Sequence, residues 1–204
     1  MIIPGNQGYE DEADSLIHHY EQLSFEDAHR HVLDFIPQYP ATIADIGAGT
    51  GREAGYLADL GHRVVAVEPT RAFFEAAQKL HPSKNITWVA DHLPNLAKII
   101  TRAGSFDLVM ISAVWMHLDQ AERQLAMPIV ASLLKTNAIL MMSLRHGPVP
   151  EGRRMFEIPT DEMLSLAAQH GLEAIRHVDS DSISPQNQSN GVTWTHFIFR
   201  KTRR

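Results

Sequence analysis

Apolar, β-branched runs alternate with helical patterns along the interior of the chain. Five short runs, bounded by polar or turn-forming residues, predict buried strands at Thr42–Ile46, Arg63–Val67, Ile86–Val89, Phe106–Ser112 and Ala138–Leu144. Apolar residues at helical spacing predict helices over Gly51–Leu60, Ala72–Leu80, Leu93–Ala103 and Asp119–Lys135. Pro128 is expected to kink the last of these. Buried strands separated by helices predict a parallel sheet covered on both faces.

The pattern changes after this alternating region. A helix is predicted over Thr160–His170, followed by strands at Leu172–Asp179 and Val192–Arg200. No helix separates these two strands, so they form a hairpin and the last strand runs antiparallel. The sequence therefore predicts a doubly wound, Rossmann-like α/β fold whose sheet is mostly parallel, with an antiparallel last strand.

The segment before the first strand is predicted to be helical. Asp14–Glu21 fits a short helix, and Ser24 with Asp27 fits the N-cap of a second helix that Pro37 stops. Ligands of doubly wound sheets bind at the carboxyl ends of the strands, so this segment is expected to form a lid there. Residues 1–204 are expected to form one domain, with a lid at 1–40, a binding core at 41–144 and a substrate side at 145–204.

Composition narrows the possible functions. The chain has 204 residues, 44% of them apolar, and no cysteine, so disulfides, thiolate zinc sites and catalytic thiols are excluded. A formal charge of −6 disfavours a broad nucleic-acid-binding face. No apolar run approaches the ~20 residues of a membrane span and no leader pattern is present, so we expect a cytoplasmic protein without membrane contact. No histidine spacing indicates a metal site.

A glycine-rich bend follows the first strand, in the stretch IADIGAGTGR at Ile43–Arg52. Gly47, Gly49 and Gly51 allow unusual torsions and a close approach of the backbone to a ligand. The nicotinamide-dinucleotide fingerprint would place glycine at position 52, where Arg52 stands, and it does not require an acid at Asp45. The bend therefore predicts a small-molecule cradle and disfavours a dinucleotide.

This bend resembles motif I of the class I S-adenosylmethionine-dependent methyltransferases. The resemblance continues through VVAVEP, VADHLP and FDLVMISAVWMHL, and it covers roughly residues 42–144. The terminal hairpin also fits the family's seven-stranded sheet with its reversed last strand. The sequence departs from the family at Lys135–Ala138, where many relatives have a Pro-Gly-Gly turn.

The resemblance implies S-adenosylmethionine as cofactor. Glu68 would bind the ribose hydroxyls, Asp91 the adenine amino group and Asp45 the methionine end. The full set of implied contacts is Asp45, Gly47, Ala48, Gly49, Gly51, Glu68, Pro69, Asp91, His92, Leu93 and Ser112. Without a cofactor, Asp45 and Asp91 could instead cap helices, Glu68 could be an exposed acid, and the glycines could serve only the turn.

The acceptor side has less specific signals. A general base is needed only when the acceptor carries a proton that must leave, and His117, with an ordinary pKa near ~6.5, is the candidate. The alternative is a histidine packed at the N-terminus of the Asp119 helix. Trp115 is expected to form a wall of the pocket.

The long loop Arg145–Pro159 carries a cluster of basic residues. Arginine side chains match carboxylates and phosphates, so the cluster predicts an anionic acceptor, and surface pairing with Glu151 and Glu157 is the competing explanation. The loop Asp179–Gly191 is expected to be mobile, and His18, His19, His29 and His31 are expected to be surface or partly buried helix residues. The predicted acceptor-side residues are Tyr20, Trp115, Arg145, His146, Arg153, Arg154 and Trp194.

The predicted function is methyl transfer to an unidentified, small, anionic acceptor. A methyltransferase that modifies a macromolecule such as RNA or protein, and a non-catalytic S-adenosylmethionine-binding protein, are the alternatives. The stretch Ser112–Trp115 reads SAVW where amino-methylating DNA enzymes have NPPY, and no nucleic-acid module is appended. The oligomeric state is not predicted.

Overall fold

The computed structural model describes residues 3–203 and contains one seven-stranded sheet in the order β3-β2-β1-β4-β5-β7-β6. Strands β1 to β5 are parallel to one another, and β7 lies between β5 and β6, antiparallel to both. The strands are β1 (Thr42–Ile46), β2 (Arg63–Val67), β3 (Ile86–Val89), β4 (Phe106–Ser112), β5 (Leu134–His146), β6 (Leu172–Asp181) and β7 (Thr193–Lys201). The predicted Rossmann-like fold and its reversed last strand are confirmed.

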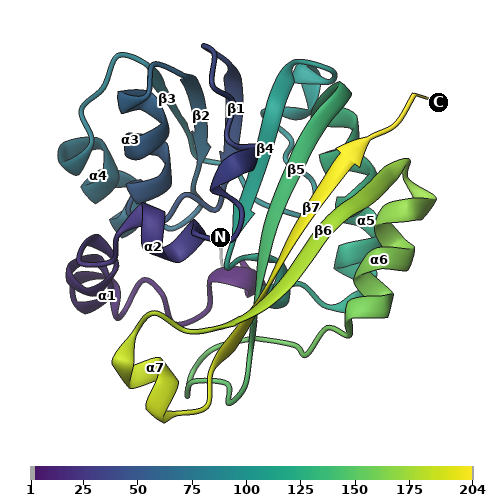
Figure 1. Cartoon of the computed structure of the whole chain (residues 1–204). Helices are drawn as coiled ribbons and strands as arrows, with labels where there is room; N and C mark the ends of the chain where they lie inside the picture. The colour runs from purple at the N-terminus through teal and green to yellow at the C-terminus, as the bar shows by residue number, and fades with distance from the viewer. Residues whose placement is uncertain (1–2, 204) are drawn as a thin grey trace.

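Helices cover both faces of this sheet (Figure 1). They are α3 (Arg52–Asp59), α4 (Arg71–Leu80), α5 (Gln120–Leu133) and α6 (Thr160–Gln169). Successive strand residues point to opposite faces. Ile43 therefore packs with Leu57 of α3 in one apolar cluster, while Ala44 packs with Met127 of α5 in the other. The two clusters make the strands apolar on both sides, as their sequences predicted.

The predicted helix at Leu93–Ala103 is wrong. This stretch forms turns that end in the 3-10 helix η3 (Ile100–Arg102). The Asp91 carboxylate accepts hydrogen bonds from the backbone N–H groups of His92 and Lys98. These bonds stabilise the turn conformation of the stretch. Leu93, Leu96 and Ile99 are nevertheless buried under the sheet at a three-residue spacing, and that spacing produced the helical signal.

The N-terminal segment packs at the carboxyl ends of the parallel strands (Figure 1). It contains η1 (Pro4–Asn6), α1 (Ala13–Glu21), α2 (Phe25–His29) and η2 (Leu33–Phe35). Ser24 caps α2 by accepting a hydrogen bond from the Asp27 N–H, as predicted, but the helix ends at His29, well before Pro37. A short helix, α7 (Pro185–Ser189), occupies the loop that was expected to be mobile.

Within residues 3–203, no helix has the length and apolar character that crossing a membrane requires.

Candidate active site

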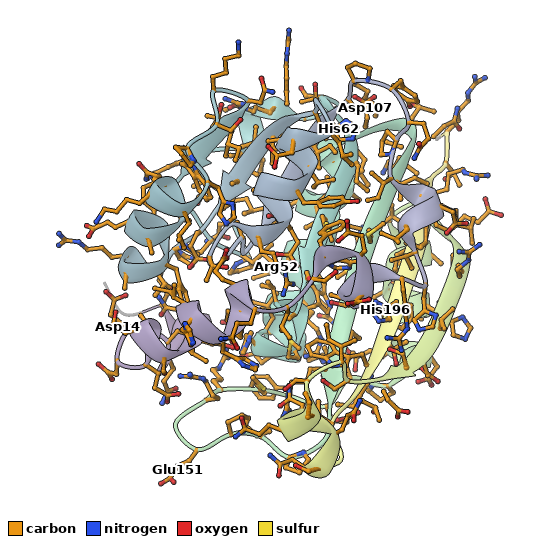
Figure 2. The ribbon with its side chains drawn as sticks, turned by 60° about the vertical axis from the view of Figure 1, so that its left-hand side comes forward. Asp14, Arg52, His62, Asp107, Glu151 and His196 are labelled. Carbon is orange, nitrogen blue, oxygen red and sulfur yellow. The ribbon has the colours of Figure 1, made fainter. Side chains whose placement is uncertain are left out.

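A cavity of about 650 Å³ lies at the carboxyl ends of the strands, under the N-terminal segment. Its walls come from the turns after β1, β2, β3 and β4, from the loop after β5, and from β7. Figure 2 shows Arg52 and His196, two residues of the wall, both on the side that the N-terminal helices cover. Segments at opposite ends of the chain therefore enclose one space.

The glycine bend is held against its neighbours by the backbone. The N–H groups of Gly47 and Ala48 both donate to the Val67 carbonyl of β2, at 2.8 and 2.9 Å. Gly47 has φ of 76°, and a Cβ there would collide with the Val114 side chain. Gly49 is in the cavity wall, and a Cβ built on it would meet nothing within 4 Å. The bend therefore presents bare backbone to the cavity.

Gly51 has a structural role and does not contact the cavity, whereas the prediction made it a cofactor contact. It is absent from the cavity wall, and a Cβ at this position would lie 2.6 Å from the Trp88 ring. Its φ is 86°, in the left-handed region that favours glycine. Gly51 thus permits the start of α3 to pack closely against β3, and we withdraw it as a cofactor contact.

Glu68 is a buried acid of the cavity wall, only 4% exposed. One carboxylate oxygen accepts from the Thr70 N–H at 2.7 Å, and the other accepts from the Gly49 N–H at 2.8 Å. Burial raises the pKa of the carboxyl, although these N–H groups oppose the rise. The alternative of an exposed strand-end acid is wrong for Glu68. The contact with Gly49 joins the end of β2 to the glycine bend.

Asp91 lines the cavity beside His92 and Leu93. Its two carboxylate oxygens accept from the N–H groups of His92 and Lys98 at 2.9 and 2.7 Å. Asp91 thus shapes the turn after β3, which resembles the capping alternative, but no α-helix follows. Each oxygen keeps a second lone pair for a donor in the cavity.

Asp45 is a buried acid with an unpaired oxygen. It is 1% exposed, and its Oδ2 has no hydrogen-bond partner among residues 3–203. Burial raises the pKa of Asp45 well above its ordinary range, and the charge of Glu53 raises it further. An unpaired polar atom at this depth is costly, so it marks a place for a donor that the chain itself does not supply.

Two further charged residues of the site follow the glycine bend, and sequence reasoning missed their roles. Arg52 lies in the cavity wall, contacts the Glu53 carboxylate, and has an Nε without a partner among the described residues. Glu53 also pairs with the Nε2 of His29, at 3.2 Å. His29 is 2% exposed, so its expected place among surface or partly buried residues is wrong. The adjacent opposite charges of Arg52 and Glu53, directly after the bend, were the available signal.

Of the seven predicted acceptor-side residues and the candidate base His117, five line the cavity and three do not. Those in the wall are Tyr20, His117, Arg145, Arg153 and Trp194. Trp115, His146 and Arg154 lie elsewhere, for three different reasons.

Trp115 is fully buried in the apolar core, where it begins the 3-10 turn η4 (Trp115–His117). His146 bonds Glu157 and Thr195, at 2.6 and 2.9 Å. Arg154 pairs with acids at the start of α5, namely Asp119 and Glu122. The predicted pocket-wall role of Trp115 is therefore wrong. For His146 and Arg154 the alternative of pairing with nearby acids describes the structure better than substrate contact does.

His117 is a buried histidine with both nitrogens engaged. Its Nδ1 is 2.8 Å from the Arg154 carbonyl oxygen, to which only an N–H can donate. Its Nε2 is then the acceptor for the Tyr9 hydroxyl, at 3.1 Å. Burial lowers the pKa of His117, and burial raises the pKa of Tyr9. Both groups are therefore neutral near pH 7.

Two arginines give the acceptor side a positive charge. The Arg153 side chain is 4% exposed, stacks on the Tyr9 ring at 4.1 Å and pairs with Glu12 at 2.9 Å. Its Nη1 has no hydrogen-bond partner among residues 3–203. Arg145 donates to the Pro148 carbonyl oxygen at 2.9 Å. Among residues 3–203, the half-exposed Glu12 pairs with Arg153, and Arg145 has no salt-bridge partner.

Known structures share this architecture. A TehB-like S-adenosylmethionine-dependent methyltransferase from Corynebacterium glutamicum has a TM-score of 0.70 at 21% identity, covering 94% of this chain and 99% of that one. A methyltransferase in complex with the Trm112 activator of Haloferax volcanii has a TM-score of 0.77 at 13% identity, covering 97% and 99%. The 1,6-didemethyltoxoflavin-N1-methyltransferase of Burkholderia thailandensis, solved with that compound and S-adenosylhomocysteine, has a TM-score of 0.67 at 18% identity, covering 100% and 92%.

No curated protein matches the chain. Residues 43–137 match the model of a methyltransferase domain family. This segment includes the glycine bend, Glu68, Asp91 and η4, which are the parts of the cavity wall nearest to β1, β2, β3 and β4. Together with the strand order and the reversed β7, this match supports a class I S-adenosylmethionine-dependent methyltransferase.

Proposed function

We propose that the protein methylates a small anionic acceptor, held by Arg145 and Arg153. The observation that carries this proposal is the charge of the acceptor side: among residues 3–203, Arg145 and Arg153 of the cavity wall have one salt-bridge partner, Glu12, which pairs with Arg153. A buried guanidinium with an unpaired N–H is costly unless a ligand pairs with it. Arginine presents a planar fork that fits carboxylate and phosphate oxygens.

The cofactor would occupy the part of the cavity between the glycine bend and Asp91. Glu68 would accept from the ribose hydroxyls, and Asp91 from the adenine amino group, with His92 and Leu93 against the ring. Asp45 and Arg52 have unpaired polar atoms near the bend, which suit the ammonium and carboxylate of the methionine end. Pro69 and Ser112 complete the wall.

S-adenosylmethionine supplies a methyl group that its sulfonium already activates. The residues of this chain would therefore act mainly by aligning the acceptor and excluding water. The N-terminal segment would provide the exclusion, because Tyr9 and Tyr20 line the cavity and pack against Phe73 of α4. Trp194 would flank the acceptor from β7.

A screen of small metabolites with methyl-labelled cofactor tests the proposal. We expect labelled products from carboxylates or phosphates and none from their neutral amides or alcohols. In the double variant Arg145→Gln/Arg153→Gln, the KM for the acceptor should rise tenfold or more, since charge-assisted hydrogen bonds contribute about 1.5 to 3 kcal/mol. The Kd of S-adenosylhomocysteine should stay within about twofold.

Arg154→Gln is the matched control, because Arg154 lies on the same loop and pairs outside the cavity. Neutral acceptors, or an unchanged KM in the double variant, would contradict the anionic assignment. Cofactor binding without any labelled product would favour the non-catalytic alternative.

A further inference from the structure

Three histidines that lie near one another line part of the cavity. We define this histidine pocket by His29 at the end of α2, the following His31, and His196 on β7. Hydroxyl and amide side chains complete it, namely Ser180 near the end of β6, and Ser184 and Asn187 from the β6–β7 connection. Among residues 3–203, no three histidine or carboxylate side chains form a group that could hold a metal ion. The chemistry of the pocket is therefore that of its imidazole rings.

His29 is the most deeply buried histidine of this pocket, with 2% of its surface exposed. Its Nε2 lies 3.2 Å from the Glu53 carboxylate. Its Nδ1 has no hydrogen-bond partner among the described residues. A carboxylate can only accept when ionised, so Nε2 carries the proton and Nδ1 keeps a free lone pair.

Glu53 is suited to hold His29 in this tautomer. Burial alone would raise the pKa of Glu53, yet the Arg52 charge and the His29 hydrogen bond hold that pKa far below its usual range. The carboxylate thus stays ionised, and it would stabilise a positive charge on the imidazole ring. Glu53 is itself fixed, because it lies in the first turn of α3, directly after the glycine bend.

His117 offers a contrast within the same cavity. Its Nδ1 donates to the Arg154 carbonyl, and its Nε2 accepts from Tyr9. An acceptor proton could reach His117 only if Tyr9 moved away. No acid pairs with His117, and Arg153 and Arg154 disfavour a positive charge on it. His29 has the free nitrogen and the acid partner that His117 lacks.

We propose that His29, oriented by Glu53, is the general base of methyl transfer and that the acceptor atom is an N–H or O–H group bound in the histidine pocket. This proposal rests on the proposed function, since it assumes methyl transfer in this cavity. It replaces His117 in the role that the sequence suggested. Glu53 acts through His29 and is a positioning residue.

The reaction balances without another reactant. The lone pair of the acceptor nitrogen or oxygen forms a bond to the methyl carbon, and the carbon–sulfur bond breaks with its electron pair remaining on sulfur. The acceptor proton passes to Nδ1 of His29, whose new positive charge faces Glu53. S-adenosylhomocysteine and the methylated acceptor leave, and His29 returns the proton to water.

The charges around His29 come from three places. Glu53 and Arg52 face it from α3, Arg30 and His31 follow it in the chain, and His196 faces the pocket from β7. Burial lowers the pKa of His196 to about 4, and the neighbouring His29, His31 and Arg30 contribute to this fall. His196 is therefore neutral near pH 7.

Methyl p-nitrobenzenesulfonate, a small reagent that methylates unprotonated imidazole nitrogens, tests for the free lone pair without any acceptor. We expect Nδ1-methylhistidine at position 29, formed at least about tenfold faster than any product at position 117, as peptide mapping and hydrolysis would show. The Glu53→Gln variant should yield a mixture of both ring isomers at His29. Modification of His117 in preference to His29, or of neither, overturns the proposal.

Turnover measurements distinguish a general base from a histidine that has only a packing role. On the acceptor from the methyl-label screen, His29→Gln should lower kcat by about 100-fold or more, the usual size of general-base catalysis. It should also remove the rise of kcat with pH, while the Kd of S-adenosylhomocysteine stays within about threefold. Gln can still donate to Glu53, so folding should be preserved.

His18→Gln is the control, because His18 lies outside the cavity wall, and it should retain kcat. Full turnover by His29→Gln overturns the base assignment. Failure of the wild type to bind S-adenosylhomocysteine would instead contradict the proposed function, so the two failures are distinguishable.

Discussion

The two halves of the cavity are assembled in different ways. The cofactor half, around β1, β2 and β3, is built from residues close in sequence and from backbone groups, as in the bonds from Gly49 and Thr70 to Glu68. The acceptor half depends on side chains from distant segments, such as Tyr9 with His117 and Glu12 with Arg153. A local motif can therefore specify the first half, whereas the second exists only once the whole fold has formed.

The largest expected effect comes from Glu68→Ala in the cofactor half. The change leaves the N–H groups of Gly49 and Thr70 without their acceptor, and each unsatisfied buried donor costs about 1 to 3 kcal/mol. We expect the free energy of unfolding to fall by about 2 kcal/mol or more and the S-adenosylmethionine affinity to fall tenfold or more. Calorimetry and urea unfolding would measure both, and an unchanged affinity would remove Glu68 from the cofactor site.

A pH experiment tests the acceptor half. The pKa of His196 is lowered by burial to about 4 in the folded state, against an ordinary value near ~6.5. Below pH ~6.5 the unfolded chain binds the proton first, so His196 should reduce stability progressively as the pH falls toward 4, by about 3 kcal/mol in total. Above pH ~6.5 it should contribute nothing.

Urea unfolding of the wild type and His196→Gln between pH 7 and pH 4 would isolate this contribution from other groups. The difference between the two proteins should change with pH in the stated direction. A constant difference would mean that His196 is solvated and that the histidine pocket is open.

Gly47→Ala probes the contact between the halves. A left-handed φ costs a non-glycine residue about 1 to 2 kcal/mol, and the new methyl group would meet Val114 of the turn after β4. We expect cofactor affinity to fall about tenfold, with partial recovery in Gly47→Ala/Val114→Ala. Equal loss in the single and double variants would show that backbone strain alone is responsible.

The smallest effect is expected for Trp115→Phe. Trp115 lies in the core, and its Nε1 has no hydrogen-bond partner among residues 3–203, so a smaller aromatic ring loses packing but no polar contact. The cost in unfolding free energy should stay below about 2 kcal/mol. The Kd of cofactor and the KM of acceptor should remain within about twofold. A large rise in the KM for the acceptor would contradict this position and indicate that Trp115 lines the pocket.

The same division explains what the sequence could predict. The bounds of β1, β2, β3 and β4 agree with the predictions, because each is an apolar run between turn residues. The positions of Glu68 and Asp91 also followed, since each ends a strand. Local patterns carry this information, and the structure places both acids in the cavity wall.

The acceptor half could not be predicted in this way. The burial of His29 depends on its hydrogen bond to Glu53, which lies in another helix. Trp115 packs in the apolar core because its side of η4 faces the sheet. The arginines of the β5–α6 loop have similar sequence surroundings, yet Arg153 faces the cavity and Arg154 faces α5. Only tertiary contacts distinguish them.

The insertion of β7 between β5 and β6 has a consequence for synthesis on the ribosome. β7 is the last strand in sequence, yet it pairs with β5 on one side and with β6 on the other. Until residues 193–201 leave the exit tunnel, β5 has an unpaired edge and β6 has no place in the sheet, while the strands β1 to β4 can already associate. A nascent chain stopped near residue 190 would therefore display a long apolar strand edge, the kind of surface that chaperones cover and that aggregates form from.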